Sequence, residues 1–447
     1  MSLFDVCLLA FPAHPTAADL ATAFTWLLGT TVVVAVVARF VRIPTTVALV
    51  IVGLVVGVSV KSIAIPLPAG LILRVFMPIL LFEAAYAIPW GWLRRELSYV
   101  SALAIPGVLV GTLIVGAIVH VAGLSWGGAL LFGALTTATD PISVLATFRQ
   151  LGAPRRLALI VEGESLFNDA TALVLFGLIL SVVLTGHASA TVVGIAFIVS
   201  LAGGILLGGA VGVLTIALRS RLDDSPLQIA ATVALAFGTF TVAEYLHATV
   251  SGTTIGVSPV IAVVVYGLIL GNHPTNQAMS RASRSAMDTT WEFLGATANA
   301  LLFLLIGLQI NAYRPRMHDI PLILWSIAAL LLSRAFIVSS LLPIVDHFSR
   351  SRKRPREPRR TLPRSYSPVI IWGGLRGALA LAAALSLPDG LPERRVIEVM
   401  TFAIVLFTVV VQGLTIGPLV TALGLHQPAA PPHRPSSDSD QQVASTE

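Results

Sequence analysis

Long apolar segments, separated by short charged loops, follow one another almost without interruption from about Leu20 to Leu423. Most reach the roughly 17–25 residues that a helix needs to cross the hydrocarbon core of a bilayer. Of the 447 residues, 56% are hydrophobic and 11% are charged, whereas a soluble domain carries about 25% charged residues. Lipid offers no hydrogen-bond partner to the backbone, and a helix satisfies its own. We therefore predict an all-α polytopic membrane protein.

The apolar segments number thirteen, although two of them are short and Pro259 interrupts one of these. Their approximate positions are 20–38, 45–60, 67–87, 98–122, 126–148, 155–184, 190–218, 226–247, 255–271, 288–310, 319–343, 366–387 and 395–423. We predict one membrane domain over residues 1–425. Residues 426–447 are polar and rich in Pro and Ser, so we predict that they form a disordered cytoplasmic tail.

Basic residues are concentrated in alternate loops, which predicts the orientation of the chain. The basic loops hold Arg39/Arg42, Arg94/Arg95, Arg149/Arg155/Arg156, Arg219/Arg221, Arg281/Arg284 and the run from Arg350 to Arg364. Lys and Arg in short loops mark the cytoplasmic side. We expect a multi-pass protein of the cell (inner or plasma) membrane with an external N-terminus and a cytoplasmic C-terminus. The net charge of +6 resides in these loops, which argues against a nucleic-acid partner.

Carboxylates occur inside two neighbouring spans of the stretch 136–175. These are Asp140, Glu162, Glu164 and Asp169. A carboxylate at mid-bilayer depth costs roughly 2.5–3.5 kcal/mol on insertion scales, so it faces protein or water and usually has a function. Asp140 precedes Pro141, which removes a helical hydrogen bond and frees nearby carbonyls. Oxygen donors around a broken helix suit a dehydrated hard cation. The stretch therefore predicts a cation site.

Helical spacing divides the polar residues of the second of these spans into two faces. Ser165 and Asp169 are four residues apart and share one face, while Glu164 and Asn168 share an adjacent face. One face suits an ion pathway and the other a structural partner. Arg376 carries the single charge of its span and needs a counter-ion, for which Glu164 is our prediction.

Some intramembrane charges also allow a purely structural explanation. A paired or snorkelling side chain explains Glu83 as well as a role in the cation site does. For Arg334 and Glu244, the sequence favours the structural explanation over a functional one. Asp140, before a proline, could simply cap the second half of a broken helix.

Breaks in matching spans predict internal symmetry. Pro141 interrupts the fifth span, and Gly373, Gly374 and Gly377 surround Arg376 in the twelfth. Six spans, a linker helix and six further spans would place the two halves in opposite orientation. An inverted repeat whose broken helices cross at the binding site is typical of secondary transporters.

Five motifs stand out within the predicted spans and the loops beside them. They are PILLFEAA (78–85), ATDPISVLATFRQLGAPRRL (138–157), VEGESLFNDATALVLF (161–176), ALLFLLIGLQI (300–310) and GGLRGALALAAAL (373–385). These motifs resemble those of monovalent cation/proton antiporters of the NhaP and eukaryotic sodium/proton exchanger type. The resemblance implies a thirteen-span homodimer. It also implies a core domain from spans near 98–184 and 319–423 that moves against a dimerisation part from spans near 20–87 and 190–310.

The resemblance also assigns roles to residues. It implies that Asp169 is the carboxylate shared by proton and cation. The predicted cation site is completed by Asn168, Ser165, Thr139, Asp140 and Glu83. Glu164 with Arg376 corresponds to a structural ion pair, and Arg334 is a further candidate. Asn168 before Asp169 matches the electroneutral branch. Ala85 stands where the family usually has glycine.

The function implied is secondary active sodium/proton antiport, without a cofactor, by alternating access at one carboxylate. Either a proton or a cation neutralises that carboxylate, and the empty charged form would cross the low-dielectric barrier only at high cost. Potassium/proton antiport and a cation channel remain alternatives. An intramembrane hydrolase using two Asp residues is disfavoured, because HExxH and GxSxG motifs are missing from the sequence, so we expect a protein that is not an enzyme.

Overall fold

The computed structural model describes most of the chain. It covers residues 17–41, 43–59, 69–186, 189–219, 224–250, 253–273, 281–351 and 361–426. The predicted tail, from residue 427 onward, lies outside the described residues, as does the part of the basic loop at 352–360.

The N-terminal half of the described chain is helical. Its elements are α1 (Ala17–Val41), α2 (Thr45–Ser59), α3 (Ala69–Leu71), a π-helical turn η1 (Ile72–Phe76), α4 (Met77–Ala87), α5 (Trp90–Ala104), α6 (Pro106–Val121), α7 (Trp126–Thr137), α8 (Ile142–Leu151), α9 (Arg155–Thr185) and α10 (Ala190–Arg219).

The C-terminal half adds one small sheet to the helices. Its elements are α11 (Ser225–Tyr245), β1 (His247–Val250), β2 (Thr253–Gly256), α12 (Pro259–Asn272), α14 (Arg281–Leu308), η2 (Gln309–Asn311), η3 (Met317–Asp319), α15 (Ile320–Ser351), α16 (Tyr366–Trp372), α17 (Ala378–Leu385), α18 (Arg394–Phe407), η4 (Thr408–Gln412) and α19 (Gly413–Ala422). The strands β1 and β2 form an antiparallel pair, which the all-α prediction did not include.

The described residues contain ten helices, some built from consecutive elements, that are long and apolar enough to cross a membrane. Two further apolar helices, α2 and α12, are shorter, and they fall where the sequence has its short segments. The pair α16–α17 is interrupted between Trp372 and Ala378. Apart from the β1–β2 pair, the prediction of a helical, multi-span membrane protein is therefore confirmed.

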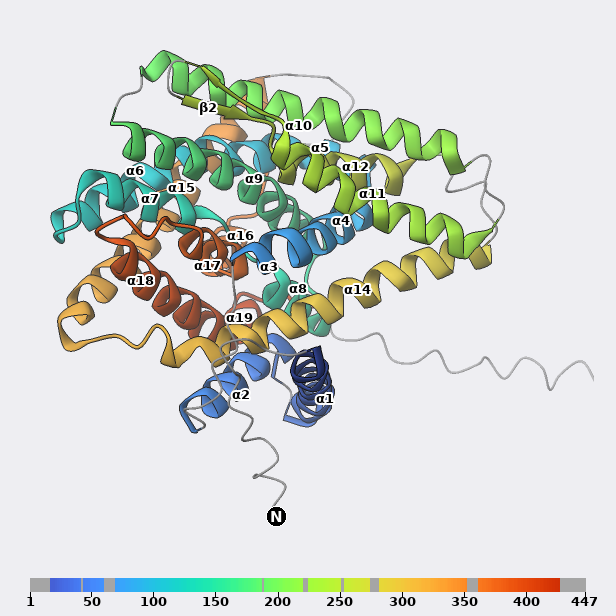
Figure 1. Ribbon diagram of the computed structural model, residues 1–447, viewed down its shortest axis with the longest axis horizontal. Helices are drawn as coiled ribbons and strands as arrows, with labels where there is room; N and C mark the ends of the chain where they lie inside the picture. Colours follow the sequence, from blue (N-terminus) through green and yellow to red (C-terminus); the bar gives the residue numbers. More distant parts are fainter. Residues whose placement is uncertain are drawn as a thin grey trace, which may run out of the picture.

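Two groups of helices pack mainly among themselves. In one group α2 packs against α14, and α12 packs against α4, α10 and α11. In the other, α7 packs against α6 and α9, α5 against α9, and α15 against α6. Figure 1 shows α1 and α2 together near one end of the long helix α14, with α10, α11 and α12 gathered at the other side of the molecule.

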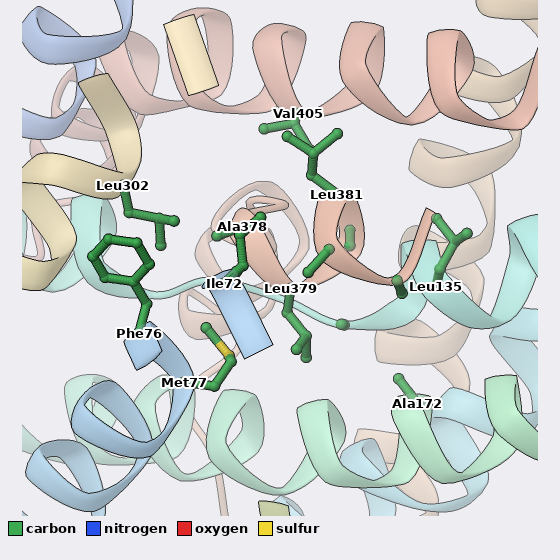
Figure 2. Packing of buried hydrophobic residues seen from close by; sticks show 14 of the residues in the cluster. Ile72, Phe76, Met77, Leu135, Ala172, Leu302, Ala378, Leu379, Leu381 and Val405 are labelled. Atoms are coloured by element: carbon green, nitrogen blue, oxygen red, sulfur yellow. The ribbon is translucent and has the colours of Figure 1, made fainter. Parts of the chain in front are cut away.

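The segment α17 lies in the middle of the hydrophobic core, where the two groups meet. Its residues from Ala378 to Ala384 are all buried, and α17 contacts η1, α7, α14 and α18. Figure 2 shows Ile72 and Met77 close to Ala378 and Leu379 of α17, with Leu302 of α14 beside Phe76. Burial on all sides explains why α17 consists of apolar residues throughout rather than showing a polar face.

A proline and a glycine define the two ends of α9. The helix begins after Pro154, whose ring fixes the backbone ahead of the first turn, and it ends at Gly186 with φ at 72°. A left-handed residue after the last turn favours glycine. The preceding helix α8 ends in the same way at Gly152, where φ is 64°. The 31 residues of α9 correspond to about 46 Å at 1.5 Å per residue, and residues 170–172 at its middle are buried.

Candidate cation site

Two interrupted helices meet beside α9. Residues 138–141 separate α7 from α8, and residues 373–377 separate α16 from α17. The amide of Asp140 donates to the carbonyl of Leu375 at 2.7 Å, so the two breaks touch through their backbones. A side chain at Gly377 would collide with the Asp140 carboxylate, which explains the need for glycine there. The breaks predicted at Pro141 and around Arg376 are therefore real and adjacent.

Asn168 and Ser165 hold the first break against α9. The Asn168 amide donates to Thr139 Oγ1 at 2.7 Å and accepts from the Thr139 backbone amide at 3.2 Å. The Ser165 hydroxyl donates to the Thr139 carbonyl. All three groups of Thr139 are thus engaged by α9, and both Asn168 and Ser165 are buried. Asn168 and Ser165 therefore hold the unwound backbone of residues 138–141 in place, and this backbone forms one wall of the site.

A cavity of about 470 Å³ lies on one side of this wall. The predicted cation residues that line it are Glu83, Thr139, Asp140, Ser165 and Asp169, joined by Glu162. Asn168 is buried behind them. The structure therefore brings together, from α4, the α7–α8 break and α9, the oxygen-bearing side chains that the sequence predicted to be neighbours.

The Asp140 carboxylate has a structural contact as well as a place in the cavity. Its Oδ1 accepts from the backbone amide of Ile142 at 3.0 Å, which satisfies one of the free amides at the start of α8. The capping explanation is therefore correct for this oxygen. The second oxygen, Oδ2, lies against Gly377, at the crossing of the two breaks.

The opposite face of α9 carries a buried ion pair, and its partner differs from the predicted one. Glu164 binds Arg334 of α15 through both carboxylate oxygens, with Oε2 accepting from Nη2 at 2.7 Å and Oε1 from Nη1. The two side chains are 1% and 9% exposed. Arg334 also donates to the carbonyl of Ile370. The prediction that Glu164 pairs with Arg376 was therefore wrong. The planar guanidinium of Arg334 reaches Glu164 from α15 in the bidentate geometry that suits a carboxylate.

Arg376 turns back onto its own broken segment instead. Its Nη1 donates to the carbonyl of Gly374 at 2.7 Å, and its backbone amide donates to Thr408 at 3.0 Å. Within the described residues its Nε has no hydrogen-bond partner. Arg376 nevertheless lines one small cavity together with Glu164, Asn168 and Arg334, so it lies on the Glu164 side of α9.

Glu244, the last of the intramembrane carboxylates that the sequence analysis singled out, is paired. Arg74 of η1 lies 2.9 Å from Glu244 at the end of α11, with side chains 60% and 35% exposed. The structural explanation that the sequence favoured for Glu244 is confirmed. A pair this exposed contributes little to stability.

The cavity also contains residues that the sequence interpretation missed. Thr45 and Thr46 from α2, Arg149 from α8, and Glu292 and Asn299 from α14 all line it. Asn299 is a polar residue inside a predicted span and directly precedes the motif at 300–310. Its position in the sequence could therefore have identified it as a candidate site residue. Thr46 was harder to find, because its hydrogen bond to Ser143 at 2.5 Å joins segments that are distant in the sequence.

Crossed helix breaks beside a cavity lined with carboxylates define a secondary transporter. The transmembrane family model described as sodium/hydrogen exchanger matches residues 27–422, and the chain belongs to this family. The family consists of transporters, so the expectation that the chain is not an enzyme is confirmed.

Several relatives are similar over most of their length. The Na⁺/H⁺ antiporter ApNhaP of Aphanothece halophytica is 40% identical, with 86% of this chain and 71% of the relative covered. The antiporter NhaP of Pseudomonas aeruginosa is 35% identical, with 92% and 98% covered. In structure, the sodium proton antiporter MjNhaP1 of Methanocaldococcus jannaschii matches with a TM-score of 0.71 at 20% identity, over 91% of this chain and 100% of the other.

Proposed function

We propose that this protein is a secondary active Na⁺/H⁺ antiporter that exchanges one sodium ion for one proton at Asp169. The observation that carries the proposal is the placement of Asp169, whose carboxylate lines a cavity together with oxygen donors from a broken helix. The relatives named Na⁺/H⁺ antiporters, 34–40% identical over most of the chain, support the same function.

Competition for one carboxylate accounts for coupling. The Asp169 carboxylate is neutralised either by a proton or by Na⁺, with Ser165, Thr139, Asp140 and Glu83 as surrounding donors. Both loaded forms are neutral and can cross, whereas the empty form carries a charge into a low-dielectric barrier. Na⁺ and proton therefore move in opposite directions without a separate gate for each. Asn168 contributes by holding the Thr139 backbone in place rather than by standing in the cavity wall.

Movement of two helix groups would give alternating access. We propose that α5–α9 and α15–α19 form a core that moves against a dimerisation part made of α1–α4 and α10–α14. Thirteen crossings then follow if α2, α12 and the broken pair α16–α17 each cross once beside the ten long helices. Six crossings on either side of a linker helix form an inverted repeat. In this proposal the protein is a homodimer of the cell membrane, with an external N-terminus and a cytoplasmic C-terminus.

Proteoliposomes loaded with a pH-sensitive dye test the function. Imposing an inward Na⁺ gradient should alkalinise the lumen, because Na⁺ entry drives proton exit. Potassium or lithium replaces sodium in parallel samples, which decides between sodium and potassium exchange. A cation channel would instead carry Na⁺ without proton movement once the membrane potential is clamped. No cation-dependent pH change with any of the three ions would contradict antiport.

A further inference from the structure

The helix α14 presents one face to the cavity. Glu292, Gly295, Ala296, Asn299 and Ala300 all line it. Their spacings of three, four, seven and eight residues from Glu292 place them on one side of a helix. This side combines a charged residue, small residues and one amide.

Asn299 carries an oxygen that the protein leaves unpaired. Within the described residues, its Oδ1 is shielded from solvent and has no hydrogen-bond partner. Buried polar atoms in native proteins are nearly always paired, and an exception calls for an explanation such as a bound ion. An amide oxygen is among the neutral donors that hard cations accept in proteins. The Asn299 side chain lines the cavity, and rotation of its amide group would present the unpaired oxygen to an ion bound there.

Gly295 brings Glu83 to the same face. A Cβ at residue 295 would lie 3.0 Å from Glu83 Cγ and 3.1 Å from its carboxylate carbon. The Glu83 side chain thus rests directly on the backbone of α14. Asn299 follows one helical turn later, so the carboxylate of α4 and the amide of α14 lie along one strip of the cavity wall.

We propose that Asn299 supplies a neutral oxygen ligand to the transported cation, and that Gly295 positions Glu83 beside it. The proposal rests on the antiport function proposed above and extends its site to α14. A neutral donor strengthens cation binding without adding a charge, so it leaves a one-for-one exchange electrically balanced. It also adds to the number of oxygens around the ion, which is one of the properties that distinguish lithium, sodium and potassium.

Replacing Asn299 in the full-length protein tests the ligand role. In proteoliposomes, Asn299→Ala should raise the half-saturating Na⁺ concentration about tenfold, corresponding to 1.4 kcal/mol of binding free energy, with a smaller change in maximal rate. The ratio of half-saturating concentrations for lithium, sodium and potassium should shift as well. Asn299→Asp retains an oxygen and should bind Na⁺ no more weakly than the unchanged protein.

The neighbouring Thr297→Val is the matched control, because Thr297 is on α14 but is not among the residues that line the cavity. It should leave affinity and selectivity unchanged. An Asn299→Ala protein with unchanged Na⁺ affinity and selectivity would overturn the ligand role. So would an Asn299→Asp protein weakened as much as Asn299→Ala, since that would show a packing role for the amide.

Gly295→Ala tests the positioning role through a double variant. Alone, it should weaken Na⁺ affinity severalfold, because the new methyl group displaces Glu83. Combined with Glu83→Gln, it should add little to the effect of Glu83→Gln alone, and full additivity of the two changes would refute the positioning role. Failure of the proposed function is recognised separately, because the unchanged protein would then show no cation-coupled proton movement at all.

Discussion

The two polar faces of α9 show how one helix can carry both a mobile charge and a fixed one. On the cavity face, Asp169 stands among oxygen donors and no ion pair involving it is found in the described residues. On the other face, Glu164 is 1% exposed and held by both arms of Arg334. Both residues are acids, five positions apart. The difference lies in the partner: the guanidinium of Arg334 pairs with Glu164, while Asp169 faces a cavity, where we propose that exchangeable cations bind.

The largest effect is expected for Asp169→Asn. The amide keeps the shape of the side chain but neither titrates nor supplies a full charge to Na⁺, so exchange in proteoliposomes should fall to background. The protein should still fold, because the change removes a charge that has no fixed partner. Melting followed by tryptophan fluorescence in detergent provides the control. Exchange at the normal rate in this variant would place the shared carboxylate elsewhere.

Glu164→Gln should reduce stability more than it reduces Na⁺ affinity, the reverse of what we expect for Asp169→Asn. Removing one partner of a buried ion pair leaves an uncompensated charge, which costs about 3–5 kcal/mol of stability. We expect a lower melting temperature and less folded protein, with the Na⁺ affinity of the remaining folded molecules little changed. A loss of affinity with unchanged melting would mean that Glu164 belongs to the ion site.

A double-mutant cycle identifies the partner of Glu164. Combining Glu164→Gln with Arg334→Gln should show a coupling energy at the upper end of the roughly 0.5–3 kcal/mol seen for residues in contact. The same cycle with Arg376→Gln should give a much smaller value, because Arg376 acts on Glu164 without a hydrogen bond. Equal coupling in both cycles would show a shared three-residue network.

Local sequence patterns did not show whether Arg334 or Arg376 pairs with Glu164. Hydropathy predicted the helices, and the charge and proline pattern predicted a cation site within residues 136–175, because both depend on local chemistry. The inclusion of Thr139 and Glu83 in that site came from the family resemblance. The partner of Glu164 depends on how α15 packs across α6 and α16, which no local pattern encodes. Asn299 and Thr46 were missed for the same reason. Their polarity was visible in the sequence, but their approach to the cavity depends on the packing of α14 and α2.

Acidification should weaken sodium binding at the cavity face alone. Na⁺ and a proton compete for Asp169. At pH values below the pKa of this carboxylate, each further unit of acidification should therefore raise the half-saturating Na⁺ concentration up to about tenfold. Exchange rates measured over a grid of pH and Na⁺ concentration check the competition. A half-saturating Na⁺ concentration that does not depend on pH would contradict a single shared carboxylate.

The smallest expected effect is that of the membrane potential. One elementary charge moved across 100 mV corresponds to about 2.3 kcal/mol, so a process that moves net charge responds strongly to a potassium–valinomycin potential. In one-for-one exchange Asp169 crosses only when neutralised, and the Glu164–Arg334 pair moves as a neutral unit. The rate of Na⁺-driven proton movement should therefore be the same at zero and at 100 mV of either sign. Acceleration by one sign and slowing by the other would show that a second charge travels with the core, and Asp140 and Glu83, two further carboxylates of the cavity wall, would be the first residues to replace.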